Sequence, residues 1–183
     1  MSATTLDLFP PDKPAPTPGR SYPLSVASGS PPILRYTEED SERAEAEWKA
    51  TCGPHSIAAA CGLTLDQVRP ALTNYKGWMS PTQVTQALLA LGKVCGLTHH
   101  LKTDKLCEGI NRVQWEGKWL NPGVPARVAY FHTHWVAHFG GWVLCTACEP
   151  AKWIPAAEWR HFHLECEPRS PFHITHHYVL ANK

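Results

Sequence analysis

The order of helix and strand signals along the chain is the feature that most constrains its fold. Helix-start signals lie between residues 37 and 92: Thr37 with Asp40, Thr64 with Gln67, and Ser80 with Pro81 and Gln83. Each places an acid or amide three positions after a capping hydroxyl, where it can complete a capping box. Strands are predicted at 95–102, 112–116, 127–139, 141–147 and 173–180, with a short helix near 155–162. Helices followed by antiparallel strands predict an α+β fold, with the N-terminal helices packed on a C-terminal sheet.

The first 36 residues are rich in proline. The prolines stand at positions 10, 11, 14, 16, 18, 23, 31 and 32. Because proline breaks helices and lacks the amide donor of a strand, we expect residues 1–36 to form an extended arm and residues 37–183 to form the domain. Interleaved apolar residues leave two interpretations open, a disordered tail or a tether bound by a protein partner.

The composition excludes several classes of protein. The formal net charge is +1 and 43% of residues are hydrophobic, which is typical of a globular domain rather than a nucleic-acid-binding one. No apolar run is long enough to span a membrane, and no basic segment followed by an apolar stretch begins the chain. We therefore expect a cytoplasmic protein. Its seven cysteines, an odd number, are expected to be reduced thiols rather than a disulfide framework.

Cys52 stands where a helix is predicted to begin. Pro54 suits the first helical turn, alanines continue the helix, and Gly62 is expected to end it. Free amide groups at a helix N-terminus favour an anion, and the thiolate is the nucleophilic form of cysteine. Cys52 is thus a candidate nucleophile, and a small buried core cysteine is the alternative.

His134 lies in a histidine-rich strand that leads into a two-glycine turn. Gly140 and Gly141 predict a tight hairpin, in which His134 lies opposite Ala147. We expect the imidazole to face the helical layer and to reach Cys52 as a general base. The alternative is a core histidine bonded to a backbone carbonyl.

These residues resemble a known group. Cys52-Gly53-Pro54 at a helix start, followed about eighty residues later by His134-Trp135-Val136, is similar to the papain-like cysteine peptidases, above all to the double-glycine-leader peptidases that process bacteriocins. The runs 113–117, 122–123 and 132–137 also look like uncharacterised phage-encoded relatives. The resemblance covers residues 47–155. It implies a thiol hydrolase, a peptidase or amidase, that acts on a peptide or protein with Cys52 and His134 and needs no cofactor.

Two departures from the family pattern leave an alternative open. The family places a glutamine before the cysteine, and residues 45–51 contain none. The family also orients its histidine with Asp or Asn, for which Glu149 is the predicted substitute because it has the right parity in the strand. The alternative is a catalytically degenerate papain-like domain that serves as a binding or assembly module. A phage structural or host-inhibiting protein of this kind could be virion-associated.

A third possibility uses the later cysteines. Cys145 and Cys148 have the spacing of a metal knuckle, and His161, His163 and Cys166 follow within reach. Cys145, Cys148, His161 and Cys166 therefore form an alternative zinc site. Against it, a regular strand would point Cys145 and Cys148 to opposite faces.

Overall fold

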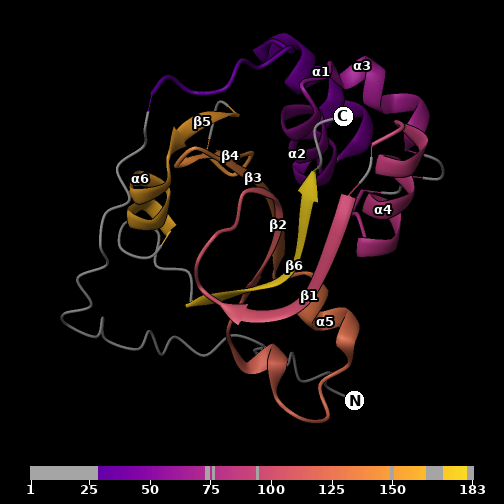
Figure 1. Cartoon of the computed structure of the whole chain (residues 1–183). Coiled ribbons are helices and arrows are strands. Elements are labelled where there is room, and N and C mark those ends of the chain that lie inside the picture. Colours follow the sequence, from indigo (N-terminus) through magenta and orange to yellow (C-terminus); the bar gives the residue numbers. More distant parts are fainter. Residues whose placement is uncertain are drawn as a thin grey trace, which may run out of the picture.

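A computed structural model describes residues 29–72, 75, 77–93, 95–148, 151–163 and 171–180. Helices dominate the first half of the described chain and strands the second (Figure 1). The helices are α1 (Glu38–Trp48), α2 (Cys52–Cys61), α3 (Leu65–Val68), η1 (Arg69–Ala71), α4 (Pro81–Ala90), η2 (Lys118–Leu120), α5 (Ala126–Tyr130) and α6 (Ala156–His161). The strands are β1 (Cys95–Thr103), β2 (Gly109–Trp115), β3 (Thr133–Phe139), β4 (Trp142–Cys145), β5 (Lys152–Pro155) and β6 (Phe172–Leu180).

The helix-start signals read from the sequence are confirmed. The side chains of Thr37, Thr64 and Ser80 each accept a hydrogen bond from the amide three residues on, and each forms a complete capping box. Gly62 ends α2 in a left-handed conformation, with φ of 63°. These elements depend on residues three to four positions apart, so the local sequence is sufficient to specify them.

The six strands form one antiparallel sheet in the order β1-β6-β2-β3-β4-β5. The β3–β4 hairpin has the predicted register, because Phe139 pairs with Trp142 across Gly140 and Gly141. Both glycines have positive φ, 57° and 82°, which a two-residue hairpin turn requires. The paired residues of β3 and β4 run only as far as Ala137 and Leu144.

Two apolar cores lie on opposite faces of the sheet. The larger joins the N-terminal helices to the sheet through Ile57, Leu88, Trp135 and Tyr178. The smaller packs Trp159 of α6 against the other face. The α+β class, with N-terminal helices packed on an antiparallel sheet, is confirmed, and α6 covers part of the far side (Figure 1).

Two segments differ from the sequence-based expectation. Residues 127–139 were expected to form one strand, but α5 occupies the first part and β3 the second. The Gln114 side chain donates hydrogen bonds to the carbonyls of Ala129 and His132, so a residue from β2 holds the chain reversal between α5 and β3. The short strand β5, which pairs with β4, was not predicted.

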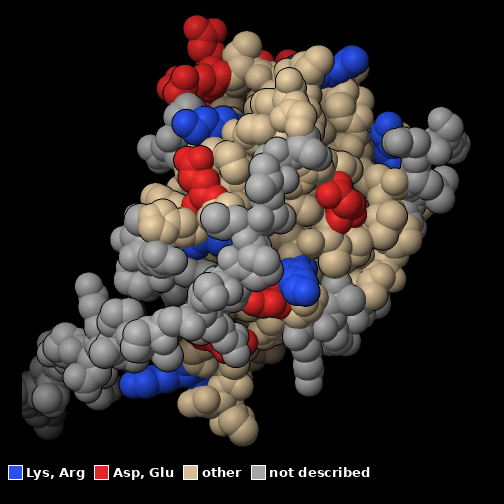
Figure 2. Space-filling model, turned by 60° about the vertical axis from the view of Figure 1, so that its left-hand side comes forward, with Lys and Arg blue, Asp and Glu red and all other residues tan. Residues whose placement is uncertain are grey.

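Charged side chains of both signs are mixed on one face of the molecule (Figure 2). Lys and Arg side chains are interspersed with Asp and Glu on the face that Figure 2 shows, and the basic groups form no continuous patch there. Within the described part of the chain, every helix is too short or too polar to cross a bilayer.

Candidate active site

Cys52 is the first residue of α2, and its neighbours fix the start of that helix. A Cβ at Gly53 would lie 2.5 Å from the sulfur of Met79, so α2 can approach Met79 this closely only with glycine there. The buried His55 ring bonds through Nδ1 to the Thr51 carbonyl at 3.0 Å and through Nε2 to Ser41 Oγ at 3.1 Å. The Cys52 side chain is half-buried, so it is anchored and still reached by solvent.

The Cys52 thiol forms a hydrogen bond with the His134 imidazole. The backbone amides of Trp135 and Gly53 also donate to the sulfur. Burial raises the pKa of the Cys52 thiol, but the bond to His134, its positive charge and the two amides together lower that pKa below its usual value. The arrangement therefore favours the nucleophilic thiolate.

His134 reaches Cys52 by a route that differs from the expected one. Trp135 packs in the core beneath the N-terminal helices and Val136 in the opposite core, so strand alternation places His134 on the face that α6 covers. The expectation that His134 faces the helical layer was wrong. Because the β3–β4 pairing stops at Ala137, the β3 edge at Trp135 is free for Cys52.

Behind the imidazole lies a sulfur. His134 Nε2 is 3.2 Å from Cys145 Sγ. Burial lowers the pKa of His134, but the charge of Cys145 and the hydrogen bonds to both sulfurs raise it to about 10. Cys145 is thus the residue that contacts this side of the imidazole, and Glu149, the predicted orienting residue, lies outside the described residues. Ala147 is not a ladder partner of His134, because the β3–β4 pairing ends at Ala137 and Leu144 and β4 ends at Cys145.

Sequence reasoning missed Arg112, a buried cation beside the thiol. It lies on β2 opposite Trp135 and is 5% exposed. Burial lowers the pKa of its guanidinium. Electrostatic interactions with Tyr130, Tyr178 and the Cys52 thiolate raise that pKa but do not cancel the effect of burial. Its guanidinium carbon is 5.3 Å from the centre of the Tyr130 ring. Arg112 lies two positions after Ile110, so both side chains point to the same face of the sheet. A charged residue on the face of an apolar, buried one was the sequence signal that could have identified it.

A second polar cluster adjoins the first. Cys145, Cys148 and His163 bring three potential ligand atoms within 4.8 Å of one another. Of the four residues predicted as a zinc site, Cys145 and Cys148 meet, His161 is exposed and outside the cluster, and Cys166 lies outside the described residues. His163 takes the expected place of His161. The objection that Cys145 and Cys148 would face opposite ways was wrong, because β4 ends at Cys145.

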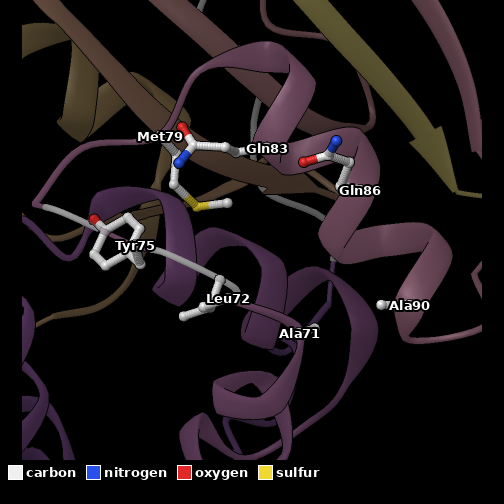
Figure 3. A pocket seen from close by; sticks show the side chains of 7 residues that line it. All are labelled: Ala71, Leu72, Tyr75, Met79, Gln83, Gln86 and Ala90. Atoms are coloured by element: carbon white, nitrogen blue, oxygen red, sulfur yellow. The ribbon is translucent and has the colours of Figure 1, made fainter.

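A pocket of about 380 Å³ lies between η1 and α4, with Met79 in its wall (Figure 3). Leu72, Tyr75 and Met79 line one part, and α4 contributes Gln83 and Gln86. Met79 links this pocket to the start of α2, since the same side chain packs against Gly53.

An exposed pair of aromatic rings stands near the same site. Trp78 stacks on Tyr130 with ring centres 6.0 Å apart, and the two residues are 52% and 47% exposed. Because Arg112 lies against the Tyr130 ring and interacts with Cys52, this aromatic rim borders the candidate site.

Comparison with known proteins adds no family to this geometry: no protein-family model, no curated protein and no solved structure matches the chain.

Proposed function

We propose that this chain is a papain-like thiol hydrolase that cleaves a peptide or amide bond, with Cys52 as nucleophile and His134 as general base. The hydrogen bond between the two side chains at the first turn of α2 carries the proposal. It joins a thiol and an imidazole from segments more than eighty positions apart in the sequence. Both residues are partly exposed, which supports access of a substrate.

The reaction uses these groups in two steps. The Cys52 sulfur attacks the carbonyl carbon, its proton having passed to His134, and the carbonyl oxygen becomes negative. The imidazolium then protonates the leaving amine as the C–N bond breaks, which leaves an acyl thioester on Cys52. Water, deprotonated by His134, attacks the thioester and releases the acid and the free thiol.

The negative oxygen needs donors near the sulfur. The Cys52 amide lies at the N-terminus of α2, a ten-residue helix whose first amides and dipole favour an anion. Arg112 adds a positive charge that interacts with the Cys52 thiolate. These groups stand in for the glutamine that the papain-like pattern places before the cysteine.

The surroundings support an extended peptide substrate. The pocket beside Met79 is large enough for a bulky side chain and combines an apolar wall with the amides of Gln83 and Gln86 (Figure 3). The stacked Trp78 and Tyr130 offer flat apolar surface for neighbouring residues of the same peptide.

Site-resolved alkylation tests the proposal. The protein is treated with limiting iodoacetamide at pH 7, and the modified cysteines are quantified by mass spectrometry over time. Cys52 should react at least tenfold faster than Cys61 and Cys107, and His134→Ala should remove that advantage. Labelling of Cys52 no faster than these two internal references rules out an activated nucleophile.

A non-catalytic binding module is the second candidate. Its supporting observation is that the His134 imidazole, among the described residues, bonds to two sulfurs rather than to a carboxylate or amide. A slow Cys52, combined with partner capture that is lost when residues 1–36 are removed, favours this candidate. Partner capture unaffected by the truncation argues against a role for the arm.

A further inference from the structure

We propose that Cys145, Cys148 and His163 bind a zinc ion, and that this ion holds Cys145 as the thiolate that orients His134. The first half of the proposal is independent of catalysis. The second half rests on the proposed hydrolase function.

The distances between the three side chains fit tetrahedral coordination. His163 Nε2 lies 3.6 Å from Cys145 Sγ and 4.0 Å from Cys148 Sγ. Zinc bonds of about 2.3 Å to sulfur and about 2.0 Å to nitrogen, at tetrahedral angles, separate sulfur from nitrogen by about 3.5 Å. Small side-chain movements therefore suffice to place one ion between the three atoms.

The backbone brings the two sulfurs to the same side. β4 ends at Cys145, and the Cys148 amide donates to the Cys145 carbonyl at 3.3 Å, which closes a tight turn. The two cysteine side chains interact across this turn. A strand continued through residue 148 would separate them, so the turn is what makes the Cys-x-x-Cys spacing usable for a metal.

The surroundings of His163 favour a bound cation over an empty cluster. The residue has no exposed surface, and its ring lies among those of Trp115, Trp159 and Phe162. In this apolar setting Nε2 faces only sulfur atoms, and Nδ1 has no hydrogen-bond partner in the part of the chain that the structure describes. A buried imidazole with such weak polar contacts is costly, and a coordinate bond would compensate it.

The donor set selects the ion. Two thiolates and one imidazole suit zinc, whereas magnesium and calcium prefer oxygen ligands. Within the described residues three side chains supply ligand atoms, so a water molecule can complete the tetrahedron.

The site also explains how a cysteine replaces Asp or Asn behind the histidine. A zinc-bound thiolate has lost its proton and can only accept a hydrogen bond. Cys145 Sγ, 3.2 Å from His134 Nε2, would therefore accept from Nε2–H and hold the imidazole in one tautomer beside Cys52. In this role Cys145 is a positioning residue.

Metal content of the full chain tests the site directly. Protein purified without chelator and dialysed should contain about one zinc per chain, and refolding with Co²⁺ should give the charge-transfer and d–d bands of tetrahedral thiolate coordination. Cys148→Ser should lose the zinc and the bands, whereas the matched Cys107→Ser should keep both. Zinc below one-tenth per chain together with featureless cobalt spectra overturns the site, as does recovery of Cys145 and Cys148 as a disulfide. The zinc content and cobalt spectrum of the wild-type protein decide whether the site binds metal, so the test remains valid even if the Cys148→Ser variant fails to fold.

A second readout separates the site from the proposed function. Removing zinc from folded wild-type protein with a chelator should slow Cys52 alkylation at least tenfold and shift its pH profile upward, and added zinc should restore both. Zinc binding with a Cys52 that is slow with and without metal leaves the site standing and removes the hydrolase. Fast Cys52 labelling that zinc removal leaves unchanged keeps the hydrolase and overturns the positioning role.

Discussion

The imidazole of His134 lies between two sulfurs, bonded to Cys52 and with Nε2 3.2 Å from Cys145 Sγ. A single histidine thus joins the candidate nucleophile to the cysteine cluster of the β4 turn. Substitutions on either side of the ring should therefore have separable effects.

Replacing Cys145 should distinguish the orienting role from metal binding. Cys145→Ala removes the acceptor behind His134 and should slow Cys52 alkylation about 10- to 100-fold, as loss of an orienting partner does elsewhere. Cys145→Asn supplies an amide oxygen that can accept from Nε2–H, so we expect it to recover most of the Cys52 rate without binding metal. Rates are measured by mass spectrometry and zinc by elemental analysis. Equal rates in the alanine and asparagine variants would contradict an orienting role.

Arg112 should assist Cys52 through its charge. Arg112→Met removes a buried cation near the thiol, so the Cys52 pKa should rise and alkylation at pH 6 should slow several-fold. Arg69→Met is the matched control, because Arg69 also lies over an aromatic ring, that of Trp48, but forms no part of the site. A pH profile of Cys52 alkylation that is the same in both variants argues against the role of Arg112.

His55 should make the stability of the domain depend on pH. Burial lowers the pKa of this histidine to about 4, whereas the unfolded chain titrates near its usual value of 6.5. Between these pH values the imidazole is protonated in the unfolded state but not in the folded state. The free energy of unfolding should therefore decrease as the pH falls from 6.5 towards 4, by about 3 kcal/mol in total. Below pH 4 this loss stops. Urea unfolding at pH 7 and pH 4.5 measures it, and His55→Gln should lose clearly less stability than wild type between the two. Parallel losses in both proteins would assign the pH dependence to other groups.

Gly53→Ala should destabilise the start of α2. The added Cβ would lie 2.5 Å from Met79 Sδ and 3.0 Å from Met79 Cβ, and Met79 is buried. Overpacking of this kind costs about 1–3 kcal/mol of unfolding free energy. Gly96→Ala is the control, since no atom lies within 4 Å of its added Cβ. The Gly53→Ala/Met79→Ala double variant should lose less unfolding free energy than the two single variants lose together, because the shortened side chain at position 79 makes room for the added Cβ. Strict additivity would show that the contact is not the cause.

Much of the helical half was predictable because its signals are local. The three capping boxes and the Gly62 terminus involve residues a few positions apart, and the Gly140-Gly141 hairpin has the predicted register. The segment at 126–130 was not predictable in this way. Its residues suit a strand, and the contacts from Gln114 that hold the following chain reversal come from another strand.

The candidate site also has parts that the local sequence predicts and parts that only the tertiary structure decides. Cys52 and His134 could be identified from the sequence because both belong to features with local signals. Cys52 stands at a helix start, and His134 lies in the first strand of a hairpin. The face that His134 occupies depended on which core takes Trp135 and which takes Val136. The approach of Cys145, Cys148 and His163 depended on where β4 ends. Strand pairing ends where the packing of distant segments no longer favours another ladder bond, and that balance is decided only in the assembled tertiary structure.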